Sequence, residues 1–402
     1  MEINHVTIGN TKIEVSSLIP VVSEIGEWWR DHVKYWQFTR QGIDIVCAKF
    51  EHSPLTNVKP IANVIIVTGW GDTFLKYAEI TKYLYENRFN VHMYDHQSQG
   101  LSGRWLPDTQ LVWINSFDDY IDDFIHFVNM ISKDDKSTSF NLPLYVLGYC
   151  MGGLVASATM ARLPSLISRT ILISPMFRNK CGIQRWNYSF ILPQPIVRWC
   201  AYLAAWAGLG SSRCLGFSRE QPETALPLNV FTSDEKQLLM QQALRCRHPQ
   251  IIANSITNDW LNETIIAQRK FAHRFDFIRT NTMIICAEHD VFVYTRAMAM
   301  FLRKSINSVM FTCKGAYHDL LHERDEIRHP LKHLILAYFK QSSDSVHLIE
   351  APRSANIVKY DKSTPVYSIA ELVLRGVGLV LAGVGAAVGT ALMIDVRRRS
   401  SR

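Results

Sequence analysis

Cys150 lies in a glycine-flanked turn whose spacing suits covalent chemistry. An apolar run from residue 142 ends in Gly148-Tyr149-Cys150-Met151-Gly152, and small residues typical of a helix follow at once. This is the G-x-S-x-G pattern of a strand–turn–helix elbow, with cysteine in the serine position. Flanking glycines leave room for a sharp turn, and the start of a helix favours the reactive thiolate form. The pattern predicts a nucleophile at Cys150 rather than a buried, inert thiol.

A nucleophile of this kind needs a base and an orienting acid, and both follow in the chain order that this chemistry uses. Asp290 comes just after an expected strand at 283–286, and His318 comes just after another at 309–311. We expect His318 to activate the thiol and Asp290 to hold the imidazole. Alternative candidates nearby are Glu288 for the acid and His289 or His322 for the base.

Acyl transfer also requires preorganised N–H donors for the developing oxyanion. One should be the backbone N–H of Met151, directly after the nucleophile. The other should come from the loop after the strand at 64–67, where the backbone N–H of Trp70 is available. Since losing one such donor typically costs about 3 kcal/mol, we expect the shape of this loop to matter.

The elements that must position these residues alternate between strand and helix, as in a mostly parallel sheet covered by helices. The expected strands are 64–67, 90–94, 144–147, 170–173, 283–286 and 309–311. The expected helices are 74–85, 118–130, 152–161, 295–302 and 330–339, the last with Pro330 at its first position. An antiparallel hairpin at 35–38 and 43–50 is expected at the sheet edge.

Segment 176–275 is too long for an ordinary crossover, and we interpret it as a cap inserted into the core. Within it, the helix expected at 195–209 carries Trp199, Leu203 and Trp206 on one face. That face could pack on the core, or it could form a lid surface that contacts an acyl chain or lipid. The division is 1–59 as an N-terminal segment with the hairpin, 60–175 and 276–340 as the core, and 176–275 as the cap.

The C-terminal part has a different character. Residues 341–375 are polar and resemble a linker, whereas 376–394 contains 19 residues without a charge, five of them glycine. A helix of that length spans about 28 Å, close to the hydrocarbon thickness of a bilayer, so a transmembrane anchor is expected there, followed by a basic tail at 395–402. A soluble amphipathic tail is the alternative.

Composition excludes several classes of protein. The 402 residues are 48% hydrophobic with a net charge of +7, and four of the arginines lie in the last six residues. The remaining charge is too small to indicate nucleic-acid binding. Eight scattered cysteines show no zinc spacing, which predicts no metal site and suits a reducing compartment. Because the N-terminus lacks signal-peptide features, we expect the catalytic domain in the cytoplasm, with the chain anchored at its C-terminal end.

The motifs resemble the lysophospholipase and monoacylglycerol lipase branch of the α/β-hydrolases, most closely the bacterial lysophospholipase type. They are 67–71, 76–79, 95–103, 117–123, 148–153, 174–177 and 315–318, within a resemblance that covers about residues 25–340. The resemblance implies an α/β-hydrolase fold with an eight-stranded sheet and a cap, no cofactor, and hydrolysis of single-chain acyl lipids through an acyl-enzyme. It places the nucleophile at Cys150, the acid at Asp290, the base at His318 and the oxyanion donors at Trp70 and Met151.

Two positions depart from that family, which usually has histidine where Thr68 stands and serine where Cys150 stands. The elbow sequence also resembles dienelactone hydrolases and polyhydroxyalkanoate synthases, which use cysteine. The leading hypothesis is a membrane-associated hydrolase of lysophospholipid or monoacylglycerol. Because a thioester also reacts with acceptors other than water, acyl transfer to an alcohol is a second hypothesis. A tail-anchored pseudohydrolase that only binds at a membrane is the third.

Overall fold

The computed structural model describes most of the chain from Glu2 to Asp361. The described residues are 2–20, 23–53, 55, 58–133, 141–185, 188–215, 217, 230–253, 255–341, 349–351 and 356–361. Met1–Tyr360 form one compact unit, and Asp361–Arg402 form a second. The transmembrane segment predicted at 376–394, the basic tail and most of the predicted linker lie outside the described residues. Among the helices that are described, none is both long and apolar enough to cross a bilayer.

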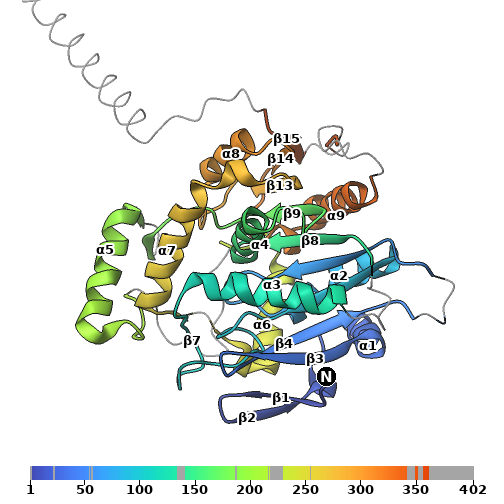
Figure 1. The fold of residues 1–402 in the computed structure, drawn as a ribbon, viewed down its shortest axis with the longest axis horizontal. Helices are drawn as coiled ribbons and strands as arrows, with labels where there is room; N and C mark the ends of the chain where they lie inside the picture. The colour runs from blue at the N-terminus through green and yellow to red at the C-terminus, as the bar shows by residue number, and fades with distance from the viewer. Residues whose placement is uncertain are drawn as a thin grey trace, which may run out of the picture. The chain divides into compact units, whose positions relative to one another are not determined.

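A mostly parallel sheet forms the centre of the first unit (Figure 1). Its order across the described chain is β15 (Ile357–Lys359), β14 (Ser308–Cys313), β13 (Asn281–Ala287), β9 (Arg169–Ile173), β8 (Leu144–Tyr149), β5 (Ala62–Val67), β6 (Phe89–Tyr94), β4 (Ile43–Phe50) and β3 (Lys34–Arg40). The strands from β14 to β6 are parallel, and both edges are antiparallel. All the predicted strands and the edge hairpin are confirmed.

The described sheet has nine strands instead of the predicted eight. The additional strand is β15, which pairs antiparallel with β14 and lies in the segment predicted to be a linker. Three residues of mixed polarity carry no sequence signal of their own, so only the unpaired edge of β14 explains why they become a strand.

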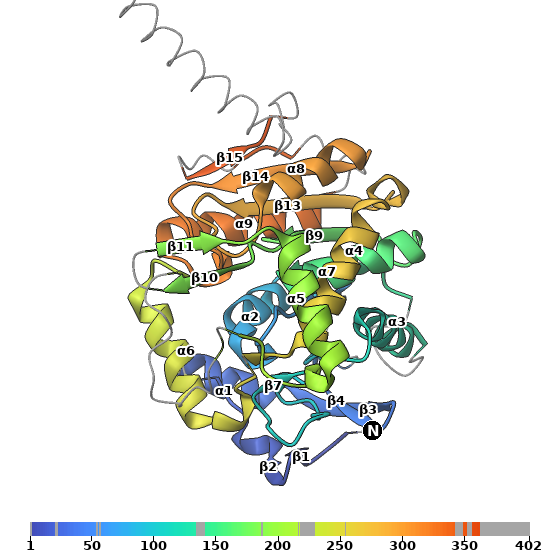
Figure 2. The same ribbon diagram turned by 90° about the vertical axis from the view of Figure 1, so that its left-hand side faces the viewer.

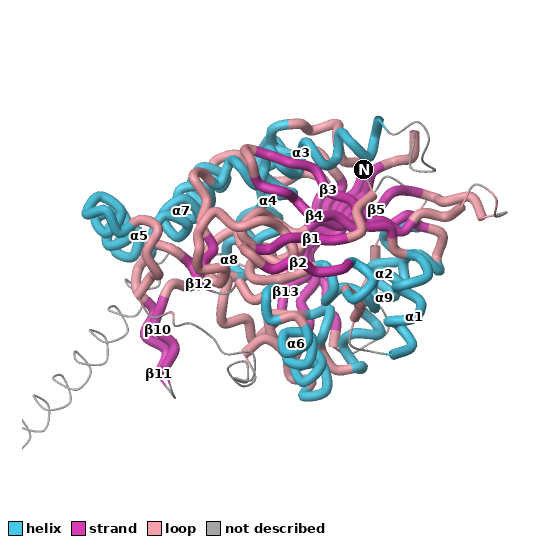
Figure 3. Tube along the Cα trace, turned by 90° about the horizontal axis from the view of Figure 1, so that it is seen from below, coloured by secondary structure: helices cyan, strands magenta, loops and turns pink. Residues whose placement is uncertain are grey.

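Helices cover both faces of the sheet (Figure 3). One face carries α1 (Ser23–His32), α2 (Ala78–Glu86), which follows a 3₁₀ turn at Phe74–Tyr77, and α9 (Asp325–Lys340). The other carries α3 (Phe117–Lys133), α4 (Met151–Arg162) and α8 (Thr295–Lys304). A small hairpin, β1 (His5–Ile8) with β2 (Thr11–Glu14), precedes α1. Since the central strands are buried on both faces, their near-continuous apolar runs follow from this layering.

The predicted start of α9 at Pro330 is wrong, because the helix begins at Asp325 and contains the proline. Pro330 cannot donate to the carbonyl of Glu326, four residues earlier. Asn356 Nδ2 donates to that carbonyl instead, at 3.3 Å. Acidic residues in the first turn and the buried Ile327 also favour the earlier start.

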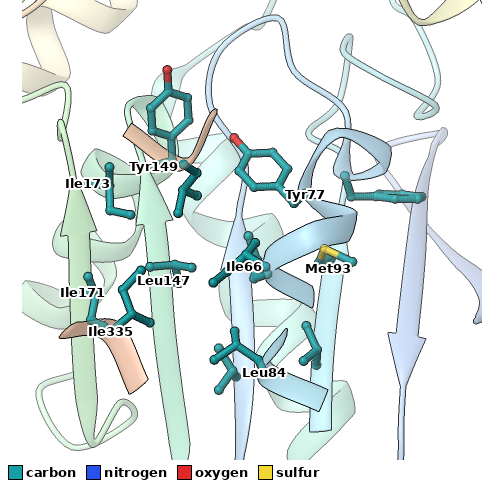
Figure 4. Packing of buried hydrophobic residues seen from close by; sticks show 14 of the residues in the cluster. Ile66, Tyr77, Leu84, Met93, Leu147, Tyr149, Ile171, Ile173 and Ile335 are labelled. Carbon is teal, nitrogen blue, oxygen red and sulfur yellow. The ribbon is translucent and has the colours of Figure 1, made fainter. Parts of the chain in front are cut away.

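The core continues directly toward the C-terminal ends of the strands (Figure 4). Ile66, Leu147 and Ile171 from three adjacent strands pack with Leu84 of α2 and Ile335 of α9. Above them in this view, the buried Tyr77 and Tyr149 have their hydroxyl groups at the same end of the sheet. Buried packing therefore fixes the base on which the strand-end loops rest.

The segment predicted as a cap contains several short elements (Figure 2). They are the hairpin β10 (Gly182–Arg185) and β11 (Tyr188–Ile191), α5 (Gln194–Ala204), a π-helical turn at Ala205–Leu209, α6 (Glu235–Arg247), β12 (Ser255–Ile256) and α7 (Asn258–Ala272). β12 pairs with β7 (Leu111–Val112), and α5 packs along α7. The aromatic face predicted on α5 is exposed: Trp199 and Trp206 are 64% and 80% accessible.

Candidate active site

Cys150 occupies a sharp, strained turn between β8 and α4. Its backbone has φ 49° and ψ −113°, which is unfavourable for any residue with a side chain. Two hydrogen bonds hold the turn: Cys150 N donates to Ile173 O at 3.0 Å, and Met176 N donates to Cys150 O at 2.9 Å. The thiol is partly exposed and contacts both hydrophobic clusters. The turn therefore presents one sulfur above the sheet, at the first turn of α4.

The elbow glycines are required by close backbone approach. A Cβ at Gly152 would lie 2.2 Å from the carbonyl oxygen of Val67 and 2.6 Å from that of Thr68. Backbone oxygens cannot move aside as a flexible side chain can, so only glycine lets α4 begin against the end of β5. This contact brings the loop after β5 beside the nucleophile turn.

His318 and Asp290 lie together at the ends of neighbouring strands. His318 Nδ1 is 2.7 Å from Asp290 Oδ2, and both side chains are buried. The other carboxylate oxygen of Asp290 accepts hydrogen bonds from Phe292 N and Val293 N, at 2.8 and 3.0 Å. Cys150 lies close enough to this imidazole to influence its pKa. The structure thus brings together the three residues predicted as nucleophile, base and acid.

The surroundings of His318 and Asp290 favour the charged form of each side chain. Burial alone would lower the pKa of His318, but the negative charge of Asp290, the interaction with Cys150 and the hydrogen bond to Asp290 raise it well above its ordinary value. Burial alone would raise the pKa of Asp290, but the charge and hydrogen bond of His318 and two backbone donors hold it below its ordinary value. Asp290 therefore stays ionised and stabilises a protonated imidazole beside the thiol.

Hydrogen bonds from the residues before and after Trp70 fix the loop that carries it. Gly69 N donates to the hydroxyl of Tyr77 at 3.4 Å, and Gly71 N donates to Gln99 Oε1 at 2.6 Å. Between them, the N–H of Trp70 makes no hydrogen bond within the described ranges, and the same is true of the N–H of Met151. Both predicted donors are therefore unengaged, on two segments that the elbow brings side by side.

Thr68 takes no part in holding this loop through its side chain. Its buried hydroxyl has no hydrogen-bond partner in the part of the chain that is described. Instead, the imidazole of His96 donates from Nε2 to the carbonyl of Thr68 at 3.2 Å. Burial lowers the pKa of His96 to about 4, so this imidazole is neutral at physiological pH. His96 and Gln99 are thus structural supports of the loop that sequence analysis did not assign.

The alternative acid and bases are engaged elsewhere. Glu288 binds Lys314 Nζ at 2.7 Å and accepts from Gly315 N at 2.9 Å. His289 is exposed beside the ring of Tyr317. His322 bonds to Asp319 Oδ1 at 2.9 Å and to the carbonyl of Lys76 at 3.0 Å. None of the three side chains contacts the Asp290–His318 pair through a hydrogen bond described in the structure.

A buried ion network joins the two loops of the site, and sequence analysis missed it. Lys76 Nζ lies 2.9 Å from both Asp72 Oδ1 and Asp319 Oδ2. Asp72 follows the loop of Trp70 and also accepts from the Tyr77 hydroxyl at 2.7 Å, whereas Asp319 is next to His318. Removing one member would leave an unpaired buried charge, so the network fixes the two loops relative to each other. Among the described residues, no group of three or more potential ligands could hold a metal ion.

The chain matches a family of known proteins over most of its length. Residues 58–325 match the model of the Hydrolase_4 family, described as serine aminopeptidase, S33. The chain belongs to this family. It is 28% identical over 290 residues to lysophospholipase L2 of Escherichia coli K12, covering 69% of this chain and 80% of that protein. Over 117 residues it is 27% identical to human monoglyceride lipase, covering 29% and 36%.

Solved structures agree on the fold. A soluble variant of monoglyceride lipase from Saccharomyces cerevisiae superposes with a TM-score of 0.60 at 15% identity, covering 77% of this chain and 95% of that one. A monoacylglycerol lipase from Paleococcus ferrophilus gives 0.56 at 14% identity, covering 73% and 98%. The α/β-hydrolase fold predicted from the sequence is therefore confirmed, and the chain is an α/β-hydrolase.

Proposed function

We propose that this α/β-hydrolase cleaves carboxylic esters of single-chain acyl lipids, lysophospholipid or monoacylglycerol, through Cys150, His318 and Asp290. The observation that carries the proposal is the hydrogen-bonded pair of Asp290 and His318 beside a thiol on a strained elbow. Kinship with lysophospholipase L2 and monoglyceride lipase supports this class of substrate. Segment 176–275 serves as the cap over the site, and its exposed aromatic face supports a role in contacting lipid.

In this mechanism, Cys150 attacks the ester carbonyl as a thiolate that is paired with the protonated imidazole of His318. The N–H groups of Trp70 and Met151 stabilise the oxyanion of the tetrahedral intermediate. His318 then gives its proton to the leaving alcohol, which departs and leaves a thioester on Cys150. Water deprotonated by His318 attacks the thioester, and collapse of the second intermediate releases the fatty acid and restores the thiolate beside the protonated imidazole. Asp290 holds the imidazole and stabilises its charged form throughout.

Hydrolysis assays with purified protein test this function directly. Released fatty acid should be detected from lysophospholipid or monoacylglycerol, and an alkylating probe should label Cys150 by mass spectrometry and abolish release. Product that appears only when an alcohol acceptor is added would assign acyl transfer, the outcome that a thioester also permits. Absence of both products, with no label on Cys150, would contradict an enzymatic role and favour a binding protein.

Membrane association through α5 and through segment 376–394 is part of the proposal. Ile196, Trp199, Tyr202, Leu203, Trp206 and Leu209 are all exposed on α5 and the adjoining turn. Apolar and aromatic side chains gathered on one helix suit insertion at the level of lipid head groups.

Replacing both Trp199 and Trp206 with alanine should weaken vesicle binding by about tenfold or more, because burying a large apolar side chain contributes roughly 1.5–3 kcal/mol. Flotation with the chain ending at Tyr360, a compact unit by itself, isolates this surface from the C-terminal segment. Leu239→Ala on α6, which removes an exposed leucine outside the surface, is the matched control. Equal binding by the double variant and the parent would show that α5 does not contact lipid.

A further inference from the structure

A pocket outside the catalytic centre lies between the loop after β6 and the cap. It has a volume of about 440 Å³. Its lining includes Trp105, Leu106 and Trp113 from the loop after β6, and Ala205, Gly208 and Asp259 from the segment predicted as the cap. Gly208 has φ 82°, which only glycine adopts without strain, so the π-helical turn that forms this side depends on it. The cap and the core thus build the pocket together.

The rings of Trp105 and Trp113 pack edge to face. Their ring centroids are 5.7 Å apart and the planes meet at 67°. Each indole nitrogen is engaged: Trp105 Nε1 donates to Gln97 Oε1 at 2.7 Å, and Trp113 Nε1 donates to Asp259 Oδ2 at 2.8 Å. These bonds fix both rings. Because both indole N–H groups already donate within the protein, neither is free to bind a hydroxyl-rich ligand. What the rings offer a ligand is their π surface, which attracts cations.

Asp259 supplies a negative charge to the same pocket. Within the described chain its carboxylate accepts from Trp113 and forms no ion pair with a lysine or arginine. Two arginines that are close to the pocket residues in sequence, Arg213 and Arg104, bind other groups. Arg213 pairs with Asp108 at 2.7 Å, and Arg104 Nη2 donates to the carbonyl of Gly100 at 2.8 Å. Among the described residues, the carboxylate of Asp259 therefore has no lysine or arginine partner.

The pocket is connected to the oxyanion loop through the first turn of α7. Asp259 lines the pocket, and the next residue, Trp260, has its ring centroid 5.9 Å from that of Trp70. Trp260 also donates to the Tyr120 hydroxyl at 3.1 Å, and this hydroxyl accepts from Gln99, which holds Gly71. One turn of helix therefore reaches both the pocket and the loop proposed to bind the substrate's carbonyl oxygen.

We propose that this pocket binds the quaternary ammonium group of a choline-bearing lysophospholipid. Fixed aromatic rings at an angle, together with a carboxylate that has no cationic partner among the described residues, match a cation that is bulky, apolar on its surface and unable to donate strong hydrogen bonds. The inference rests on the proposed ester hydrolysis and names the head group that this site prefers.

The test compares two substrates that differ in head-group charge. In vesicle-free assays below micelle formation, Asp259→Asn should raise the KM for lysophosphatidylcholine about tenfold and leave kcat unchanged, because the amide oxygen still accepts from Trp113 while the charge is lost. The KM for lysophosphatidylglycerol should not rise. Trp105→Leu should show the same selectivity. Asp276→Asn, which removes an exposed acid outside the pocket, is the matched control.

Binding measured without turnover separates this inference from the proposed function. With Cys150→Ala, tetramethylammonium should quench tryptophan fluorescence, and Asp259→Asn should lose most of that response, whereas glycerol should have no effect. If neither the lysophospholipids nor monoacylglycerol is hydrolysed, the proposed function fails, and this titration alone decides whether the pocket binds the cation. Equal KM changes for both lysophospholipids, or equal binding of glycerol and tetramethylammonium, would overturn the head-group assignment while leaving ester hydrolysis intact.

Discussion

Cys150→Ala should lower kcat for ester hydrolysis by at least about 10⁴-fold, because the other groups act only through a nucleophile. His318 has no sulfur nucleophile to pair with in this variant, and the oxyanion donors can stabilise only slow attack by water. The side chain is small and partly exposed, so the fold should be retained. Steady-state rates with saturating monoacylglycerol, together with thermal unfolding of both proteins, measure the two effects separately.

A second variant, Cys150→Ser, tests whether a hydroxyl can replace the thiol as the nucleophile. The strained turn and its glycines do not depend on sulfur, so a hydroxyl should occupy the same position beside His318. We expect measurable hydrolysis that no longer responds to alkylating reagents, whereas Cys200→Ser, at an exposed cysteine on α5, should remain sensitive. A wild-type rate in Cys150→Ala would assign the chemistry to another residue.

The central layers were predictable because each strand is an apolar run with a turn at its end. Burial on both faces makes the apolar runs in β5 and β8 easy to recognise. The nucleophile, acid and base come just after β8, β13 and β14, which are recognised in the same way. The hairpin β1–β2, helix α1 and the edge strand β15 were not predicted. Their conformation depends on contacts with other parts of the chain and not on local pattern: Trp28 of α1, for example, stacks on Phe50 of β4 with ring centroids 5.3 Å apart.

The same distinction applies to the site. Cys150 was predictable because the sharp turn requires glycines on both sides of it, and these glycines form a short motif that is visible in the sequence. Lys76 was not, since a lysine near the start of a helix usually faces solvent. Only the fold reveals that its ammonium lies between two carboxylates that come from loops more than 200 residues apart in sequence. Long-range charge networks leave no fixed spacing along the chain.

Asp290→Asn should lower kcat by about 10⁴-fold at neutral pH while leaving the fold intact, because an amide cannot stabilise the charged imidazole. The carboxylate now accepts from Phe292 N and Val293 N through one oxygen and bonds His318 through the other. Asparagine can still accept the backbone bonds, but its NH₂ then faces His318 Nδ1 and favours the wrong tautomer. Glu288→Gln, the neighbouring acid bound to Lys314, is the matched control and should keep nearly full activity.

The pH dependence of stability provides an independent measure of this pair. Asp290 has a lowered pKa, so its contribution is present above its ordinary value of 3.8 and is lost as pH falls through the native value. His318 has a raised pKa, so its contribution is complete below its ordinary value of 6.5 and is lost as pH rises through the native value. The difference in unfolding free energy between wild type and Asp290→Asn should therefore be largest between these two ordinary values, near pH 5, and should decrease as the pH rises through the native pKa of His318 or falls through that of Asp290. Denaturant titrations that give a difference independent of pH on both the acid and the alkaline side would show that the two side chains are not coupled as charges, and the imidazole would then need another source of stabilisation.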